Sequence, residues 1–310
     1  MPTRTARVVR VRAFAKINLS LRVLGRRADG YHEVRTIYQS IALHDTLVFT
    51  RRRGPLEIQC DDAACPAGET NLVFRAAEAA WRAMGRRGRP SGFDVAIEKR
   101  IPIGAGLGGG SSDAAAMLRA ASVLWGRALP LARALEAAAT LGADVPFFLV
   151  GGTTLGVARG DVLFPLPDWP QAWVVLAAPD FAVSTERAYE WWDRMTDAPT
   201  SIAVRRTRPR RQRAAIAEGW GGHLDAGELR NDLEPAVSAH HPKIGRLVDE
   251  VRDTGAAWAA MSGSGSTVFG LFGSLARATS AATALAGPGR RALITRTVGR
   301  TEYARRAKVQ

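Results

Sequence analysis

The feature that most constrains this chain is a glycine-rich segment between a strand-like pattern and a helix-like pattern. Residues 101–113 read IPIGAGLGGGSSD, and five of the seven residues at 104–110 are glycine. Without side chains, several backbone N–H groups can point at one anion, and a helix that begins directly afterwards adds the positive end of its dipole. The segment therefore predicts a phosphate-binding loop, with Ser111 and Ser112 able to reach phosphate oxygens or a bound Mg²⁺.

Two familiar phosphate loops do not account for this segment. A Walker A loop would continue with Gly-Lys-Ser or Gly-Lys-Thr, which the sequence lacks here. The residues GAGLGG satisfy most of the dinucleotide fingerprint, but the acid expected about 20 positions on is missing from 124–130. A flexible linker rarely joins a regular strand to a regular helix. A nucleoside triphosphate such as ATP is the natural occupant.

The remaining pattern predicts an α+β chain, because strands come first and helices are then interleaved without a regular βαβ alternation. Strands are expected at 8–15, 18–24, 33–40, 46–51, 56–60, 93–99, 153–157, 173–178 and at both ends of 257–272. Helices are expected at 71–84, 114–125, 131–141, 186–194, 231–238 and 244–254, with Ser111, Ser112 and Asp113 as the cap of the second. The proline-rich stretch 165–170 predicts a boundary between two domains, 1–166 and 167–310.

The net charge of +14 allows two interpretations. A nucleic-acid-binding protein would use such charge to neutralise phosphates. Only four of the 43 basic residues are lysine, however, and the arginines are spread along the whole chain. This distribution favours the second interpretation, a generally arginine-rich composition with no role in binding. The one cluster, RRTRPRRQR at 205–213, contains a proline and no interleaved aromatic residue, so it is more typical of a solvated loop.

Several classes of protein and location are disfavoured by composition. No apolar run approaches the roughly 20 residues that span a bilayer, and the basic residues 1–12 lack the apolar stretch of an export signal. Cys60 and Cys65 are too few for a disulfide framework or a zinc site. They could bond to each other, but free thiols are favoured without export. We expect a cytoplasmic protein, monomer or homodimer, that contacts neither membrane nor nucleic acid.

Four segments together resemble the GHMP kinases, the family of galactokinase, homoserine kinase and mevalonate kinase. They are PIGAGLGGGSS at 102–112, AKINL at 15–19 with DGYH at 29–32, LGADVP at 141–146 and MSGSGS at 261–266. The second segment is similar to only those members that act on a cytidine diphosphate-linked methylerythritol. The resemblance implies a two-domain fold with the active site in the inter-domain cleft. It also implies ATP-dependent phosphorylation of that substrate's 2-hydroxyl in the non-mevalonate (MEP) isoprenoid pathway, with Mg²⁺.

The resemblance also implies roles for individual residues. Lys16 and Asp144 would flank the acceptor hydroxyl, and Asn18, on the same strand face as Lys16, would bond to the substrate. Tyr31 and His32 would hold the cytosine, with Tyr189 on the other face of the base and Thr185 nearby. The phosphate loop would comprise Pro102, Ile103, Gly104, Ala105, Gly106, Leu107, Gly108, Gly109, Gly110, Ser111 and Ser112. The second glycine segment, MSGSGS at 261–266, would close over the phosphates or substrate, and 231–234 would cap a helix.

Three other functions remain possible from the sequence. Another GHMP kinase, of the homoserine or mevalonate type, would share the loop, but its substrate has no base for Tyr31 and His32 to hold. A basic nucleic-acid-binding protein is supported only by the charge. A catalytically silent nucleotide sensor is disfavoured by the presence of Lys16 and Asp144.

Overall fold

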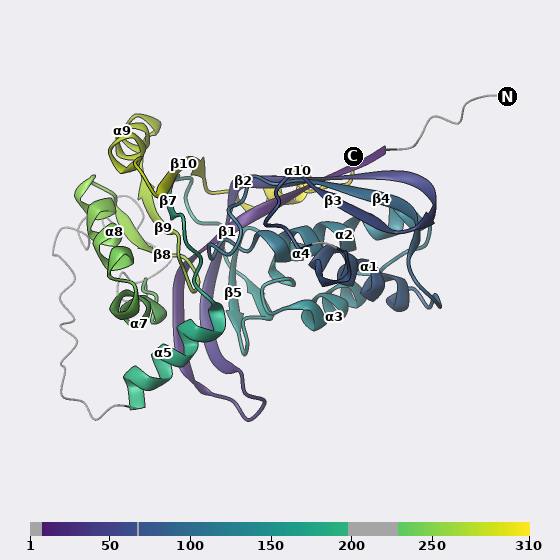
Figure 1. The fold of residues 1–310 in the computed structure, drawn as a ribbon, viewed down its shortest axis with the longest axis horizontal. Helices are drawn as coiled ribbons and strands as arrows, with labels where there is room; N and C mark the ends of the chain where they lie inside the picture. The colour runs from purple at the N-terminus through teal and green to yellow at the C-terminus, as the bar shows by residue number, and fades with distance from the viewer. Residues whose placement is uncertain (1–7, 67, 198–228) are drawn as a thin grey trace.

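Two β-sheets with helices packed on them make up residues 8–66, 68–197 and 229–310, which the computed structural model describes (Figure 1). The strands are β1 (Val8–Arg26), β2 (His32–Pro55), β3 (Glu57–Cys60), β4 (Ser91–Glu98), β5 (Thr153–Val157), β6 (Val162–Pro165), β7 (Trp173–Pro179), β8 (Trp258–Met261), β9 (Val268–Phe272) and β10 (Arg290–Arg296). The helices are α1 (Leu72–Ala83), α2 (Gly109–Trp125), α3 (Leu131–Leu141), α4 (Phe147–Val150), α5 (Thr185–Asp197), α7 (Leu233–His240), α8 (Pro242–Asp253), α9 (Leu275–Leu285) and α10 (Arg300–Arg306), with a 3₁₀ turn at Gly68–Thr70. The α+β class is confirmed.

The two sheets differ in topology. The first has six strands in the order β3-β4-β2-β5-β6, with β1 paired to β2, and β3 and β4 are its parallel pair. The second has four antiparallel strands in the order β10-β7-β9-β8. The sequence patterns did not predict β6, α4, α9, β10 or α10.

Strands β1 and β2 form one long antiparallel hairpin that reaches from the first sheet into the second half of the molecule (Figure 1). The prediction of two shorter strands in each place was wrong. The strands continue through the expected breaks, and the ladder absorbs the irregularities as register shifts between Phe14 and Lys16 and between Asn18 and Ser20. Such bulges re-aim the side chains beside them, and these two flank Lys16 and Asn18.

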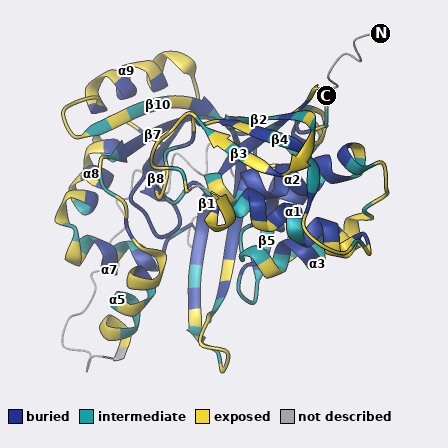
Figure 2. Cartoon of the chain, turned by 45° about the vertical axis from the view of Figure 1, so that its right-hand side comes forward, coloured by how far each residue is buried: buried dark blue, intermediate teal, exposed yellow. Residues whose placement is uncertain are grey.

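Helices α1, α2 and α3 pack together over the first sheet, with their buried faces turned inward (Figure 2). Helix α2 lies against both α1 and β1 and is buried along most of its length. Its alanine-rich sequence leaves short side chains between helix and sheet, so the two can approach closely. The N-terminus of α2 is thereby fixed at the edge where β1 passes.

Helix α10 returns the C-terminus to the first half of the molecule. The buried Tyr303 ring lies 5.4 Å from the Phe14 ring, and its hydroxyl donates to the Phe148 carbonyl at 2.6 Å. The chain crosses to the second sheet between Pro165, where β6 ends, and Trp173, where β7 begins. The proline-rich stretch lies at this crossing, and the division at 166/167 stays a prediction.

Candidate active site

A cavity of about 890 Å³ lies between the glycine-rich loop, the β1–β2 hairpin and α5. Sixteen residues predicted for the site line it: Lys16, Asn18, Tyr31, His32, Pro102, Ile103, Gly104, Ala105, Gly106, Gly108, Gly109, Gly110, Ser111, Asp144, Thr185 and Tyr189. They come from segments up to 173 positions apart, since Lys16 lies on β1 and Tyr189 on α5. The fold therefore gathers the predicted loop, the predicted polar pair and the predicted base-holding residues around one space.

The glycines of the loop meet two separate requirements. Gly104, Gly106 and Gly108 have φ values of 66°, 77° and 72°, in the left-handed region that residues with a Cβ rarely adopt. A Cβ on Gly106 would also collide with the Ser262 carbonyl oxygen, and one on Gly108 would lie 2.6 Å from the Phe148 ring. The loop backbone is therefore packed tightly from both sides.

Two predicted members of the loop point elsewhere. Leu107 is buried in an apolar cluster with Ile17 and Phe269. The Ser112 hydroxyl donates to the Phe14 carbonyl at 2.7 Å and is buried. Helix α2 begins at Gly109, because Gly108 makes the turn, so the prediction that Ser111–Asp113 cap the helix was wrong. Ser112 lies in its first turn, facing β1, and Ser111 alone of the two serines lines the cavity.

The second predicted glycine segment packs directly on the first. The Ser262 hydroxyl donates to the Gly106 carbonyl at 3.0 Å, and the Thr267 N–H donates to the Ala105 carbonyl at 3.2 Å. Asn231 holds this segment from behind, with its amide group donating to the carbonyls of Met261 and Gly263 at 2.8 and 2.7 Å. The side-chain oxygen of Asn231 also accepts from the Leu233 N–H, so Asn231 has a positioning role beyond the predicted cap.

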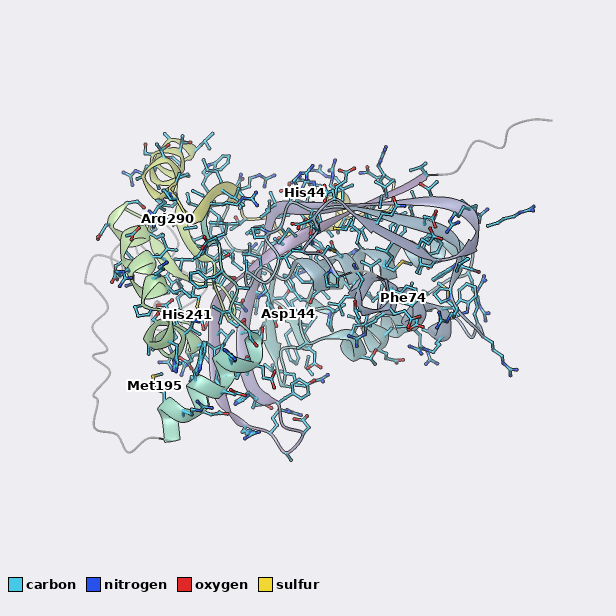
Figure 3. The ribbon with its side chains drawn as sticks, in the orientation of Figure 1. His44, Phe74, Asp144, Met195, His241 and Arg290 are labelled. Atoms are coloured by element: carbon cyan, nitrogen blue, oxygen red, sulfur yellow. The ribbon has the colours of Figure 1, made fainter. Side chains whose placement is uncertain are left out.

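Lys16, Asn18 and Asp144 form a connected polar group at one end of the loop. The buried Lys16 ammonium donates to the Asn18 side-chain oxygen at 2.6 Å and lies 3.4 Å from Oδ2 of Asp144. Asn18 in turn donates to the Thr36 hydroxyl at 2.7 Å. Asp144 stands in the turn between α3 and α4, in the middle of the molecule (Figure 3), and its side chain is 32% exposed. Oδ2 of Asp144 can therefore face both the Lys16 ammonium and a ligand in the cavity.

Aromatic side chains gather at the other side of the cavity. The His32 ring stacks on the Tyr189 ring with centroids 4.6 Å apart, and a ring nitrogen of His32 is hydrogen-bonded to Asp193 at 2.7 Å. Burial, followed by the charge of Asp144, raises the pKa of Tyr189. Tyr31 is more than half exposed at the hairpin tip, with the Arg159 guanidinium 5.0 Å from its ring centre. Arg159 lines the cavity and was not predicted.

A buried ionic cluster beneath the loop was also missed. The Lys99 ammonium donates to Asp45 at 2.6 Å and to Asp113 at 2.8 Å, and all three side chains are at most 5% exposed. Burial opposes the charged form of Lys99, but the two carboxylates outweigh it and raise its pKa. Burial also raises the pKa of Asp113, against the attraction of Lys99. The sequence signal that could have revealed this cluster is Lys99 itself, which is one of only four lysines and lies two residues before Ile101.

We expect Lys99→Met to lower the free energy of unfolding by about 3–5 kcal/mol, because it leaves two buried carboxylates facing each other without a cation. Urea unfolding followed by circular dichroism measures the change. Lys243→Met, at an exposed position of α8, is the matched control and should change stability by less than about 0.5 kcal/mol. Adding Asp113→Asn to Lys99→Met should restore part of the loss, and no restoration would contradict the explanation.

Three observations bear on the remaining predictions. No helix within 8–66, 68–197 and 229–310 is long and apolar enough to cross a membrane. Among those same residues, no three or more His, Cys, Asp or Glu side chains gather where they could hold a metal. The basic run 205–213, on which the nucleic-acid alternative rests, lies outside the described residues.

Comparisons with known proteins agree with this geometry. Residues 71–152 match the family model "GHMP kinases N terminal domain", and residues 210–291 match "GHMP kinases C terminal". The chain is 45% identical over 273 residues to a 4-diphosphocytidyl-2-C-methyl-D-erythritol kinase of Solibacter usitatus. The matched region covers 86% of this chain and 82% of the relative.

Solved structures extend the likeness to the fold. A crystal structure of a 4-(cytidine 5'-diphospho)-2C-methyl-D-erythritol kinase superposes with a TM-score of 0.73 at 35% identity, over 94% of this chain and 99% of that one. A homoserine kinase from Cytophaga hutchinsonii superposes with a TM-score of 0.67 over 98% of both chains, but at 22% identity. The second likeness shows a shared fold only.

Proposed function

The chain belongs to the GHMP kinases and, among them, to the family of 4-diphosphocytidyl-2-C-methyl-D-erythritol kinases, and we propose that it catalyses this family's phosphoryl transfer. The γ-phosphoryl group of ATP would pass to the 2-hydroxyl of 4-diphosphocytidyl-2-C-methyl-D-erythritol, giving ADP and the 2-phosphate. The observation that carries the proposal is the Lys16–Asp144 pair beside the glycine-rich loop, in the same cavity as the aromatic residues Tyr31, His32 and Tyr189.

Phosphoryl transfer needs positioning and charge stabilisation more than covalent chemistry. In the proposal, the backbone amides of the glycine-rich loop and the N-terminus of α2 hold the phosphates of ATP. Asp144 orients the substrate hydroxyl and accepts its proton as the bond to phosphorus forms. Lys16, held by Asn18, keeps positive charge beside the transferred group. Substrate carbons would lie between Asp144 and the aromatic side of the cavity.

The donor set around the loop suits a triphosphate that arrives with its own Mg²⁺. Mg²⁺ commonly keeps several waters and binds through substrate phosphates with few protein ligands. The Ser111 hydroxyl lines the cavity at the start of α2 and is the side chain that would hold the ion. When bound, the ion would neutralise charge on the phosphate oxygens.

The aromatic side of the cavity supports a nucleobase-bearing substrate over homoserine or mevalonate. Those two alcohols have no base, whereas stacking on a base contributes about 1–3 kcal/mol for each aromatic ring. In the described arrangement His32 already stacks on Tyr189, which leaves the exposed ring of Tyr31 as the clearest contact for the cytosine. Thr185 and Asn18 would bind the polar parts of the same substrate.

An assay of ADP release tests the proposal. Purified protein is given Mg²⁺-ATP with the cytidylyl substrate, with homoserine or with mevalonate, in parallel reactions. Turnover of the cytidylyl substrate alone is the expected result. Turnover of another alcohol in its place would keep the kinase and overturn the assignment of Tyr31 and His32. A salt-sensitive gel shift without any turnover would favour the nucleic-acid alternative.

We expect Tyr31→Ala to raise the KM for the cytidylyl substrate by about ten- to hundred-fold, because it removes a stacking ring. The KM for ATP should stay within about twofold, since Tyr31 lies on the β1–β2 hairpin and away from the glycine-rich loop. Tyr31 is 55% exposed, so the melting temperature should hardly change. Initial rates against each substrate measure both constants. An equal rise in both would show that the hairpin contributes to the whole cleft.

We also propose that the protein works in the cytoplasm. Cys60 and Cys65 are free thiols in the structure, as a reducing compartment would keep them. The choice between monomer and homodimer stays a prediction, to be measured by light scattering of the purified protein.

A further inference from the structure

One buried tyrosine contacts the central carboxylate of the cavity and has no role in the chemistry described so far. Tyr38 lies on β2, opposite Asn18 on β1 and Thr154 on β5, and its side chain is almost fully buried. Its hydroxyl donates a 2.9 Å hydrogen bond to Oδ1 of Asp144. The sequence pattern does not single out Tyr38, although a buried phenol needs a hydrogen-bond partner.

We propose that Tyr38 is a positioning residue for phosphoryl transfer, which holds Oδ1 of Asp144 so that Oδ2 is the oxygen that meets the substrate hydroxyl. The inference rests on the proposed function, in which Asp144 receives the hydroxyl proton. It adds an assignment of the two carboxylate oxygens to separate tasks.

The partners of Asp144 divide between its two oxygens. Oδ1 accepts from Tyr38 at 2.9 Å, and Oδ2 lies 3.4 Å from the Lys16 ammonium. The second distance is longer than a strong ionic hydrogen bond of 2.7–2.9 Å, so Oδ2 retains room for another donor. A substrate hydroxyl that approaches Oδ2 would also approach Lys16, where charge on the transferred phosphoryl group can be stabilised.

The phenol remains a donor throughout the working pH range. Burial raises the pKa of Tyr38 well above its usual value, and the charge of Asp144 raises it further. The hydroxyl therefore keeps its proton and continues to offer it to Oδ1. Because that oxygen is already bonded to a proton donor, it is the poorer acceptor for the substrate proton.

The ring of Tyr38 has little freedom to turn away. It stacks on the Phe147 ring with centroids 4.8 Å apart and planes 28° apart. The phenol oxygen of Tyr38 fits against Gly160 only because glycine has no Cβ. A Cβ at this position, where φ is 100°, would lie 2.5 Å from that oxygen. A Cβ on Gly156 would lie 2.8 Å from the ring. A fixed ring holds the carboxylate of Asp144, whose own turn is partly exposed, in one orientation before substrate binds.

Tyr38→Phe tests the inference, because it removes one oxygen and keeps the ring. We expect kcat to fall by about ten- to hundred-fold, which is the usual effect of removing a hydrogen bond to a charged group. The KM values for ATP and for the alcohol should change by less than about threefold. Tyr303→Phe is the matched control, since it also removes a buried phenol oxygen, and neither Tyr303 nor its acceptor, the Phe148 carbonyl, lines the cavity. It should lower the melting temperature and leave kcat unchanged.

A double-mutant cycle separates this role from general structural support. In an Asp144→Asn background, measured by single turnover at high enzyme concentration, Tyr38→Phe should cause no further loss. An equal loss in both backgrounds, or an unchanged kcat in Tyr38→Phe alone, would overturn the inference. All rates use whichever alcohol the parent protein turns over. Full activity of Asp144→Asn would instead show that Asp144 is not the base that the proposed function assigns. A loss of activity in Tyr38→Phe would then arise independently of Asp144, and this result would contradict the inference as well.

Discussion

Asp144→Asn should lower kcat by about 10²- to 10⁴-fold, the range in which a positioned general base contributes. The amide has nearly the shape of the carboxylate, so it can fill the same turn between α3 and α4. It carries no charge, however, and cannot take the hydroxyl proton or balance the Lys16 ammonium 3.4 Å away. The KM for ATP should stay within about threefold, because the proposal assigns binding of the phosphates to the backbone of the loop.

Initial rates of ADP release, with a nucleotide titration of each variant, measure these two effects separately. Asp253→Asn is the matched control, since it makes the same chemical change at an exposed position at the end of α8. It should retain the activity and melting temperature of the parent. If Asp144→Asn kept more than a tenth of the parental kcat, Asp144 would be at most a residue that orients the hydroxyl.

Gly106→Ala should lower kcat/KM for ATP by about a hundred-fold or more. Gly106 has a φ of 77°, which costs an alanine about 1–2 kcal/mol. The new Cβ would also overlap the Ser262 carbonyl oxygen and lie 2.9 Å from that of Gly265. Neither is the end of a flexible side chain, so the two glycine segments must move apart, and a displacement of about 1 Å can cost 10²-fold in rate.

The comparison needs a glycine-to-alanine change that meets no obstacle. Gly273, directly after β9, has no atom within 4 Å of the position that a Cβ would take, and its φ is not positive. Gly273→Ala should therefore behave like the parent in nucleotide binding and in melting temperature. Wild-type affinity for ATP in Gly106→Ala would show that the loop tolerates separation from the second glycine segment, and that the packing between them is not needed for binding.

Much of the candidate site could be predicted because its parts are local in the chain. The run of glycines at 104–110 indicates a backbone that can approach a ligand closely, and this inference does not depend on the rest of the fold. Lys16 and Asn18 lie two positions apart on a strand, so they share a face under any topology. The α1, α3 and α8 helices carry a clear 3.6-residue period, and their extents agree with prediction within a few residues.

The start of α2 and the continuity of β1 and β2 could not be predicted in the same way. Ser111, Ser112 and Asp113 have the composition of a helix cap. In the structure, however, the Ser112 hydroxyl donates to the Phe14 carbonyl and Asp113 accepts from Lys99, and the helix begins earlier, at Gly109. The long hairpin passes its irregular points because the partner strand accepts a bulge there. In both places contacts from distant residues outweigh a local preference.

The sequence alone identified the groups to which the proposed chemistry is assigned: a loop for phosphate groups, a lysine and an aspartate for the acceptor hydroxyl, and an aromatic pair for a base. The tertiary structure decided how those groups are held. Lys99 meets Asp45 across 54 positions, and Tyr38 meets Asp144 across 106. Neither pair has a spacing that a periodic pattern could reveal, because the partners lie on separate elements. Their meeting depends on the register of β2 against its neighbours and on the path of the chain around the first sheet.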